Sequence, residues 1–314
     1  MTVRRILSID GGGIRGVFPA SFLASIEEEL CEPITRYFDL IAGASTGGIL
    51  ALGLGLGFSA RELVLFYEEL AGQVFGGNRT LRYFRWFGRS KYRQETLRAA
   101  LVSTFKDKRV GHSTVRLMIP SLNLETGAVH VFKTAHHERF EKDYKELAVD
   151  VALATGAAPT YFPTFRHAAG IPLVDGGLWA NNPMGAAVVE AIGVLGWDRR
   201  DLRVLSVGCT DSPLEIGLGR RFAMGRLYWA AKVADTFMSG QSSAALGTAQ
   251  LLAGHQNVFR ISPSVPGGRF RLDSIREIPS LKGLGSSEAR QALPVLRQAF
   301  FGEPAEEFRP FKVL

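Results

Sequence analysis

Cysteine is the residue type that this 314-residue sequence uses least, with one copy at Cys31 and one at Cys209. Two cysteines this far apart supply neither a disulfide framework nor a zinc pattern, which indicates a protein of the reducing cytoplasm. The first residues lack the long apolar run of a signal peptide, and no internal repeat or disordered linker interrupts the chain. These absences argue against a secreted disulfide-rich protein and against a repeat protein.

Histidine is also scarce, and none of the six copies lies in a recognisable motif: His112, His130, His136, His137, His167 and His255. No cluster of histidine, cysteine or carboxylate side chains with ligand spacing occurs near the motifs described below, so we expect no metal in the chemistry. His136 and His137 are adjacent, and adjacent residues on a strand point to opposite faces. A surface turn is therefore expected there rather than a metal pair.

Acidic residues are fewer than basic ones, with 30 Asp and Glu against 37 Lys and Arg and a formal net charge of +7. This balance favours anionic partners such as acidic lipid or nucleotides. Hydrophobic residues make up 46% of the chain, which is enough for a large core. One stretch, residues 40–60, carries no charge and is long enough to span a bilayer. Its glycines and its strand-like start instead predict a buried strand, turn and helix.

Strand patterns alternate with helix patterns along the chain. Strands are expected at residues 5–9, 38–42, 116–122, 129–132 and 204–207, and helices at 17–30, 59–75, 147–155, 182–196, 223–254 and 287–301. Ser59 and Glu62 form a capping box, and Asn182 with Pro183 should start a later helix. The alternation predicts an α/β fold with a mostly parallel sheet. Residues 1–200 should form the domain that carries the motifs, and 201–314 a strand and helical extension packed on it.

Residues 43–47 read Gly-Ala-Ser-Thr-Gly between an expected strand and an expected helix. Gly43 and Gly47 let the backbone turn sharply without a Cβ clash, so that Ser45 projects from the turn. The N-terminus of the following helix favours negative charge as it develops on a reacting group. The G-x-S-x-G pattern therefore indicates a serine nucleophile at Ser45.

A glycine-rich segment at residues 10–16, Asp-Gly-Gly-Gly-Ile-Arg-Gly, follows the first expected strand. It also satisfies the dinucleotide pattern G-x-G-x-x-G, but that interpretation needs an acidic residue near the end of the next strand. The acidic residues at about the required distance, 27–29, fall inside an expected helix. Backbone N–H groups at Gly11, Gly12 and Gly13 fit an oxyanion hole better, because such a site needs donors fixed where charge develops.

Asp175, followed by Gly176 and Gly177, comes directly after another expected strand. Ser45 needs a base, and functional groups gather at strand ends in sheets of this kind. Asp175 is the candidate for that base. An ordinary Ser–acid–His triad is the alternative, and it would require His255, the one histidine that follows Asp175 in the sequence.

Taken together and in this order, segments 10–16, 43–47 and 175–177 resemble the patatin-like phospholipases, and residues 152–162 are similar to the segment before that family's aspartate. The resemblance covers roughly residues 5–195. It implies a three-layer fold and a Ser–Asp dyad, formed by Ser45 and Asp175, that needs no cofactor. It also implies that Gly12 and Gly13 donate N–H groups to the oxyanion and that Arg15 faces the lipid phosphate.

More narrowly, segments 122–127, 133–137 and 179–183 resemble the bacterial branch that cyclic dinucleotides activate in anti-phage signalling. That branch implies a phospholipase that degrades membrane phospholipid when a cyclic dinucleotide, such as cyclic GMP-AMP, switches it on. We then expect a cytoplasmic enzyme that associates peripherally with the inner face of the membrane when active and binds no nucleic acid polymer. Oligomerisation stays open. A constitutive lipase without nucleotide control is the alternative.

Residues 79–93 interleave cations with aromatic rings and contain no acid, and Arg82, Arg85 and Trp86 are its candidate contacts. This pattern suits a membrane interface or the stacking and phosphate contacts of a nucleotide; a loop whose aromatics pack on the core is the alternative. Arg220 and Arg221 belong to a second basic stretch, for which an ordinary helix with exposed cations fits equally well. A non-catalytic lipid- or nucleotide-binding protein and a dinucleotide-dependent oxidoreductase are the competing classes of function.

Overall fold

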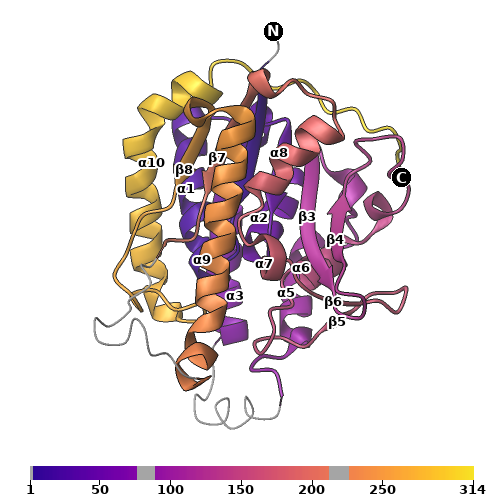
Figure 1. The fold of residues 1–314 in the computed structure, drawn as a ribbon, viewed down its shortest axis with the longest axis vertical. Coiled ribbons are helices and arrows are strands. Elements are labelled where there is room, and N and C mark those ends of the chain that lie inside the picture. Colours follow the sequence, from indigo (N-terminus) through magenta and orange to yellow (C-terminus); the bar gives the residue numbers. More distant parts are fainter. Residues whose placement is uncertain (1–2, 76–88, 212–225) are drawn as a thin grey trace.

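A computed structural model describes residues 3–75, 89–211 and 226–314, and within them the chain builds one central sheet (Figure 1). The strands of this part are β1 (Arg4–Ile9), β2 (Leu40–Gly43), β3 (Arg116–Asn123), β4 (Val129–Lys133), β5 (Phe165–Arg166), β6 (Pro172–Asp175), β7 (Leu202–Val207) and β8 (Val258–Ile261). Their order across the sheet is β5-β6-β3-β2-β1-β7-β8, with β4 paired to β3. The five neighbouring strands β3, β2, β1, β7 and β8 are parallel to one another, whereas the pairs β4–β3, β6–β3 and β5–β6 are antiparallel. The predicted α/β fold with a mostly parallel sheet is confirmed.

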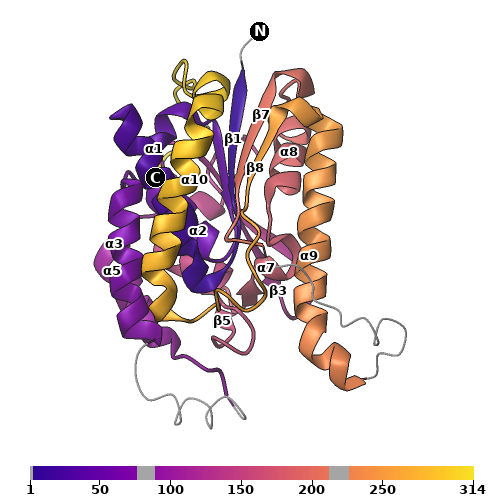
Figure 2. The same ribbon diagram turned by 90° about the vertical axis from the view of Figure 1, so that its left-hand side faces the viewer.

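Helices cover both faces of the sheet. Those in the described residues are α1 (Val17–Leu30), α2 (Thr46–Gly55), α3 (Ala60–Leu70), α5 (Gln94–Phe105), α6 (Ala148–Thr155), α7 (Gly177–Ala180), α8 (Met184–Gly193), α9 (Arg226–Ala253) and α10 (Ile278–Phe300). Figure 2 shows α1, α3, α5 and α10 on one face and α8 and α9 on the other. The result is a three-layer arrangement of helix, sheet and helix.

The apolar core lies on both sides of the sheet, because successive residues of a strand point to opposite faces. Leu7 of β1 belongs to the larger apolar cluster, which includes Phe18 and Phe22 of α1. Ile6 belongs to a second cluster that includes Val188 of α8. Burial on both faces explains why β1 reads as a nearly continuous apolar run in the sequence.

The C-terminal part of the chain continues the same sheet. β7 pairs with β1 from Arg4 to Ile9, and β8 then pairs with β7. α10 packs along α1, where the Ser21 hydroxyl donates a 3.0 Å hydrogen bond to the Lys282 carbonyl oxygen. Residues beyond 200 therefore contact the segments that carry the motifs.

Two local predictions can be compared directly with the structure. The capping box is confirmed, since Ser59 Oγ accepts the Glu62 N–H and the Glu62 carboxylate accepts the Ser59 N–H. The start of α8 differs by one residue. Pro183 occupies the cap, with φ −80° and ψ 3°, and Asn182 Oδ1 reaches past it to accept the Met184 N–H at 3.2 Å. The helix ends at Gly193 rather than near residue 196.

The uncharged stretch at residues 40–60 forms β2, a turn and α2, as predicted, and every residue of β2 and α2 is buried. Among the described residues, no helix combines the length and the apolar composition needed to cross a membrane.

The long strand β3 extends past the end of its neighbour β2. Ala42 near the end of β2 pairs with Met118, while β3 continues to Asn123. The antiparallel strand β6 pairs with this overhang and places Asp175 opposite Ser121. Although β6 is antiparallel to β3 and therefore to β2, its last residue, Asp175, lies near the C-terminal end of β2.

Candidate active site

Ser45 lies in the turn between β2 and α2 with φ 54° and ψ −123°, a backbone conformation that residues other than glycine rarely adopt. The backbone around it leaves no room for side chains. A Cβ atom on Gly43 would lie 2.0 Å from the Gly47 carbonyl oxygen, and one on Gly47 would lie 2.2 Å from the Ile9 carbonyl oxygen. The turn is therefore strained and places Ser45 at the N-terminal end of α2, as the sequence motif predicts.

Asp175 is in direct contact with the serine. The Ser45 hydroxyl donates a hydrogen bond of 2.6 Å from Oγ to Asp175 Oδ2, and Oδ1 accepts the Gly177 N–H, also at 2.6 Å. Burial raises the pKa of Asp175 to about 6, although the hydrogen bonds from Ser45 and Gly177 act in the opposite direction. A carboxyl group with a pKa in this range exchanges protons near neutral pH, as a general base must.

The two glycines after Asp175 fit a crowded exit from β6. A Cβ on Gly176 would lie 2.2 Å from the Pro120 carbonyl oxygen, and one on Gly177 would lie 2.9 Å from Asp175 Oδ1. Gly177 also starts the short helix α7, which the sequence patterns do not reveal. Both glycines therefore allow the backbone to turn closely around the Asp175 carboxylate, which accepts the Gly177 N–H.

Thr155, the last residue of α6, supports the serine from behind. Its Oγ1 accepts the Ser45 N–H at 3.0 Å and donates to the Pro120 carbonyl oxygen at 2.6 Å. Thr155 is fully buried, and its two hydrogen bonds connect the turn that carries Ser45 to β3. The sequence gives no local signal for this role, because the contact joins residues 110 positions apart.

The glycine-rich loop passes directly beside the serine, since a Cβ on Gly11 would lie 3.1 Å from Ser45 Cβ. The Gly11 N–H is already engaged, because it donates to the Asn181 carbonyl oxygen at 2.9 Å. Within the described residues no backbone acceptor faces the N–H groups of Gly12 and Gly13. The Gly11 N–H is therefore not available to an oxyanion, and an oxyanion hole formed by Gly12 and Gly13 stays a prediction.

Arg15 lies in the 3-10 turn just after these glycines and is half-buried. Its Nε donates a weak 3.3 Å hydrogen bond to the Gly12 carbonyl oxygen. The expected contact of Arg15 with a lipid phosphate stays a prediction.

Asp10, at the start of the loop, forms a buried ion pair that the sequence patterns do not indicate. Arg260 Nη1 and Nη2 donate to its two carboxylate oxygens at 2.8 and 2.5 Å, and Nη1 also donates to Ser206 Oγ at 2.7 Å. Burial alone would lower the pKa of Arg260, but the Asp10 carboxylate outweighs this effect and raises it. Arg260 comes from β8, so the C-terminal part of the chain contributes directly to the loop.

The comparisons with known proteins agree with this geometry. The model of the family described as patatin-like phospholipase matches residues 7–188, more than half of the chain. This chain belongs to the patatin-like phospholipase family. The prediction of a patatin-type serine acyl-ester hydrolase is therefore confirmed, and the Ser45–Asp175 contact has the form of the Ser–Asp dyad expected for such enzymes.

Three bacterial relatives carry the name cGAMP-activated phospholipase. The protein from Pseudomonas aeruginosa is 34% identical over 316 residues, which cover 98% of this chain and 91% of that protein. Those from Vibrio cholerae and Escherichia coli are 40% and 39% identical over 65% of this chain, covering 63% and 61% of their own lengths. The latter two matches thus span a little less than two thirds of the relatives.

The alternative triad with His255 does not fit this patatin-like site. His255 is exposed and lies in the turn that precedes β8. Ser45 follows the C-terminal end of β2, and β8 is parallel to β7, β1 and β2. His255 precedes the N-terminal end of β8 and therefore lies at the opposite end of the strands. The length of a strand separates His255 from Ser45 by about 13 Å, so His255 cannot orient or deprotonate the serine.

The expectation of a surface turn at His136 is wrong. His136 is buried, its Nδ1 pairs with Thr134 Oγ1 at 2.8 Å, and its Nε2 lies 3.1 Å from Glu190 Oε1. Lys133 donates to the other oxygen of Glu190 at 2.7 Å. The polar residues at this point belong to a buried hydrogen-bond network with Glu190, which the sequence does not indicate because Glu190 comes from the distant helix α8. In the part of the chain that the structure describes, no group of three potential metal ligands occurs.

The candidate membrane or nucleotide contacts Arg82, Arg85, Trp86, Arg220 and Arg221 lie outside the described residues. The end of the first basic segment is described. Tyr92 is buried and donates from its hydroxyl to Asp273 Oδ2 at 2.7 Å, and its ring lies 6.3 Å from that of Tyr161. This last part of the segment therefore packs on the core.

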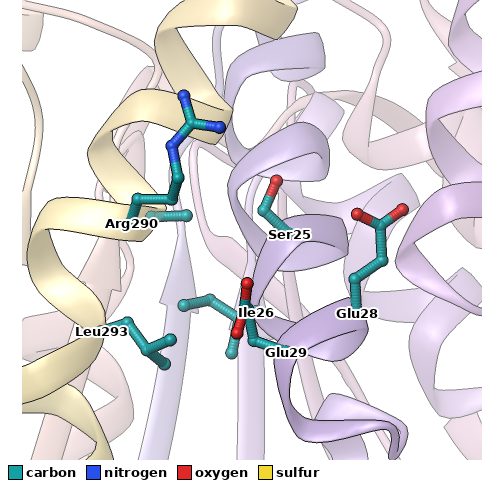
Figure 3. A pocket seen from close by; sticks show the side chains of 7 residues that line it. Ser25, Ile26, Glu28, Glu29, Arg290 and Leu293 are labelled. Atoms are coloured by element: carbon teal, nitrogen blue, oxygen red, sulfur yellow. The ribbon is translucent and has the colours of Figure 1, made fainter.

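A pocket lies between α1 and α10, away from the site (Figure 3). Its lining residues are Ser25, Ile26, Glu28, Glu29, Ala289, Arg290 and Leu293. Those from α1 come from its second half, whereas the glycine-rich loop precedes the first turn of that helix. The pocket contains none of the candidate catalytic residues.

Proposed function

We propose that this chain is a phospholipase that cleaves the acyl esters of membrane phospholipids with Ser45 as nucleophile and Asp175 as general base. The observation that carries the proposal is the 2.6 Å hydrogen bond from Ser45 Oγ to a buried carboxylate, made at a strained turn beside a glycine-rich loop. Strain and a raised pKa are features that proteins concentrate at functional sites.

The reaction proceeds in two halves. Ser45 Oγ attacks the ester carbonyl carbon while Asp175 Oδ2 takes up the hydroxyl proton, and a tetrahedral oxyanion forms. The bond from this carbon to the alcohol oxygen then breaks, and the lysophospholipid leaves with the proton from Asp175. Water attacks the resulting acyl-enzyme with Asp175 again as base, which releases the fatty acid and restores Ser45.

The glycine-rich loop supplies electrostatic stabilisation in both halves. The N–H groups of Gly12 and Gly13 receive the oxyanion and stabilise the negative charge that develops on it. Arg15, with its guanidinium beside this loop, binds the phosphate of the lipid head group. Because Asp175 is only a modest base, donors that act on the transition state must lower much of the barrier.

The proposed membrane association is supported by apolar side chains on the N-terminal half of α9. Trp229, Val233 and Phe237 are 44%, 50% and 65% exposed and, spaced four residues apart, they follow one face of the helix. The helix is tied to the active site, because Gln241 Nε2 donates to the carbonyl oxygen of Leu178 in α7 at 2.6 Å. We place the membrane contact on this face, together with the segment that contains Arg82, Arg85 and Trp86.

We further propose that a cyclic dinucleotide activates the enzyme and that the active form degrades membrane phospholipid as an antiviral response. The support is the name cGAMP-activated phospholipase that three relatives share. The net charge of +7 favours a ligand with two phosphates. Such a ligand must bind the active state more tightly than the resting state, or it shifts no equilibrium.

The test is fatty-acid release from phospholipid vesicles, measured with and without a panel of cyclic dinucleotides for the wild type and Ser45→Ala. We expect release by the wild type in the presence of one of these ligands and none by Ser45→Ala. Full activity without any ligand, together with no binding by calorimetry, would replace the switched enzyme by a constitutive lipase. No release under any condition, on vesicles or on a soluble ester, would overturn the proposed function itself.

The membrane contact needs a separate measurement. Replacing Trp229 and Phe237 with serine should weaken binding to anionic vesicles by about tenfold or more, because two large apolar side chains no longer enter the interface. Leu251→Ser is the matched control, since Leu251 is 80% exposed at the other end of α9. The variants should hydrolyse a short soluble ester like the wild type. Replacing Trp86 and Phe87 with serine tests the second proposed contact in the same assay.

A further inference from the structure

Arg260 lies outside the region that matches the family model, which ends at residue 188, and neither the motifs nor the proposed chemistry uses it. Its guanidinium is nevertheless held in place by buried polar partners. It makes three hydrogen bonds, two to Asp10 and one to Ser206. Both side chains of the pair are shielded, with 15% of Arg260 and 5% of Asp10 exposed.

The architecture leaves a path for this side chain. Arg260 in β8 pairs with Ser206 in β7, and β7 separates β8 from β1. The guanidinium therefore reaches across β7 to the residue that follows β1. At Gly208 a Cβ atom would lie 2.9 Å from Arg260 Nη2 and 2.3 Å from Ser262 Oγ. A glycine at position 208 thus keeps open the space in which the guanidinium lies.

Asp10 is the residue from which the glycine-rich loop departs. Its N–H donates to the Val207 carbonyl oxygen at 3.0 Å, and its own carbonyl oxygen accepts Cys209 Sγ at 3.3 Å. The fork of Arg260 holds the Asp10 carboxylate in one plane, since a bidentate contact fixes orientation as well as distance. The next two residues along the chain are Gly11, which faces Ser45, and Gly12.

Glycines do not hold a loop in shape by themselves, because they lack side chains and have many accessible conformations. The loop is held at its far end by the Thr46 hydroxyl, which donates to the Gly13 carbonyl oxygen at 2.8 Å, and by the Ile14 N–H, which donates to Leu272 at 2.8 Å. At its near end Arg260 forms the one ion pair that Asp10 makes within the described residues.

We propose that Arg260 is a positioning residue for the acyl transfer: by clamping Asp10 it orients the N–H groups of Gly12 and Gly13 toward the oxyanion. This inference rests on the proposed Ser45–Asp175 chemistry. Arg260 itself touches neither Ser45 nor the substrate. Its removal should therefore affect the transition state, in which the oxyanion exists, more than the binding of the neutral ester.

The test uses Arg260→Met and, as a matched control, Lys133→Met, assayed on a short soluble ester. Lys133 and Glu190 form an ion pair of similar burial, 16% and 8% exposed, outside the catalytic machinery. Arg260→Met should lower kcat by about 10- to 100-fold, because a misplaced donor loses most of its effect on the transition state. Its KM and the kcat of Lys133→Met should each stay within about threefold of the wild type.

A second readout separates positioning from a general loss of structure. A trifluoromethyl ketone adds to the serine and forms a tetrahedral oxyanion, so its affinity for Arg260→Met should fall by the same factor as kcat. Unchanged kcat, an effect confined to KM, or an equal loss of kcat in Lys133→Met would overturn the proposal.

If Arg260→Met does not fold, Asp10→Asn with Arg260→Gln removes both buried charges while keeping polar side chains at both positions. This double variant should fold and show the same reduction of kcat, and full activity in it would overturn the inference. An inactive wild type that fails to react with the ketone would instead contradict the proposed function and not the role of Arg260.

Discussion

Two buried carboxylates lie beside the same glycine-rich loop, and they differ in what they contact. Asp175 pairs with a hydroxyl and a backbone N–H, whereas Asp10 pairs with a guanidinium through both of its oxygens. Burial raises the pKa of both carboxyl groups, but only at Asp10 does a paired cation oppose the rise. The first carboxylate is therefore suited to exchanging a proton and the second to holding a fixed position.

From this difference we infer that the proposed catalytic pair and the proposed supporting pair are built from different parts of the chain. The Ser45–Asp175 pair joins two segments within the region that matches the family model, while the Asp10–Arg260 pair joins this region to β8. Asp175, whose charge must change during the proposed reaction, has no paired cation. Asp10, whose charge stays the same, is paired with Arg260.

The largest expected effect concerns the proton-exchanging pair. Ser45→Ala and Asp175→Ala should each lower kcat by about 10³-fold or more while the protein stays folded, because nucleophile and base act as one unit. His255→Ala should retain most of the activity, since His255 lies at the opposite end of the parallel strands from Ser45. Hydrolysis of a soluble ester, with circular dichroism as the check on folding, measures all three. If His255→Ala proves as inactive as Ser45→Ala, the dyad is wrong and a triad is right.

Stability should respond in opposite directions at the two carboxylates. Asp10→Asn leaves the Arg260 guanidinium buried without its anion and should lower the free energy of unfolding by about 3–5 kcal/mol. Asp175→Asn removes a carboxylate that is costly to bury and should raise that free energy at pH 8 by about 1–3 kcal/mol. Urea unfolding at pH 8 compares the two variants, and a destabilised Asp175→Asn would contradict the comparison.

The pH dependence of this gain follows from the sign of the shift. The pKa of Asp175 is raised from 3.8 to about 6 by folding, so between these values the folded protein holds more protons than the unfolded one. The contribution of this carboxyl to stability therefore falls as the pH rises from about 4 to about 6. The advantage of Asp175→Asn should be present at pH 8 and vanish near pH 4.

Catalysis should depend on the same titration. Asp175 must be ionised to accept the proton, so kcat/KM should fall about tenfold per pH unit below a midpoint near 6 and level off above it. A pH–rate profile on a soluble ester, repeated with His255→Ala, measures this. The midpoint should be the same in both proteins; a midpoint near 4 would show that burial does not raise the pKa of the base.

The smallest expected effect is that of a chelator. If either carboxylate held a metal ion, the contrast between a proton carrier and an anchor would be lost. Treatment with EDTA should leave hydrolysis of the soluble ester unchanged, because the sequence shows no ligand set near the motifs. Activity that disappears in chelator and returns with calcium or zinc would contradict this expectation.

The parts of the site that sequence reasoning located are those in which backbone crowding dictates the residue type. Gly43 and Gly47 are required within a few residues of Ser45, and Gly176 and Gly177 directly after Asp175. Such requirements leave a local signature. The same holds for the capping box of α3, whose two partners are three residues apart.

The parts that it missed depend on contacts between distant segments. Arg260 reaches a residue 250 positions away, and Thr155 supports a serine 110 positions away. Asp175 is placed by the antiparallel pairing of β6 with β3, and the buried His136 contacts Glu190 from α8. None of these has a local pattern, because the pairing is set by sheet order and packing.

The most direct test of the central claim is to trap the acyl-enzyme. Wild type, Asp175→Asn and His255→Ala are mixed with a slowly hydrolysed ester, quenched in acid and analysed by peptide mass spectrometry. The account predicts one acyl adduct, on Ser45, formed by the wild type and by His255→Ala and strongly reduced in Asp175→Asn. An adduct on another residue, or one that forms equally well in Asp175→Asn but is lost in His255→Ala, would contradict it.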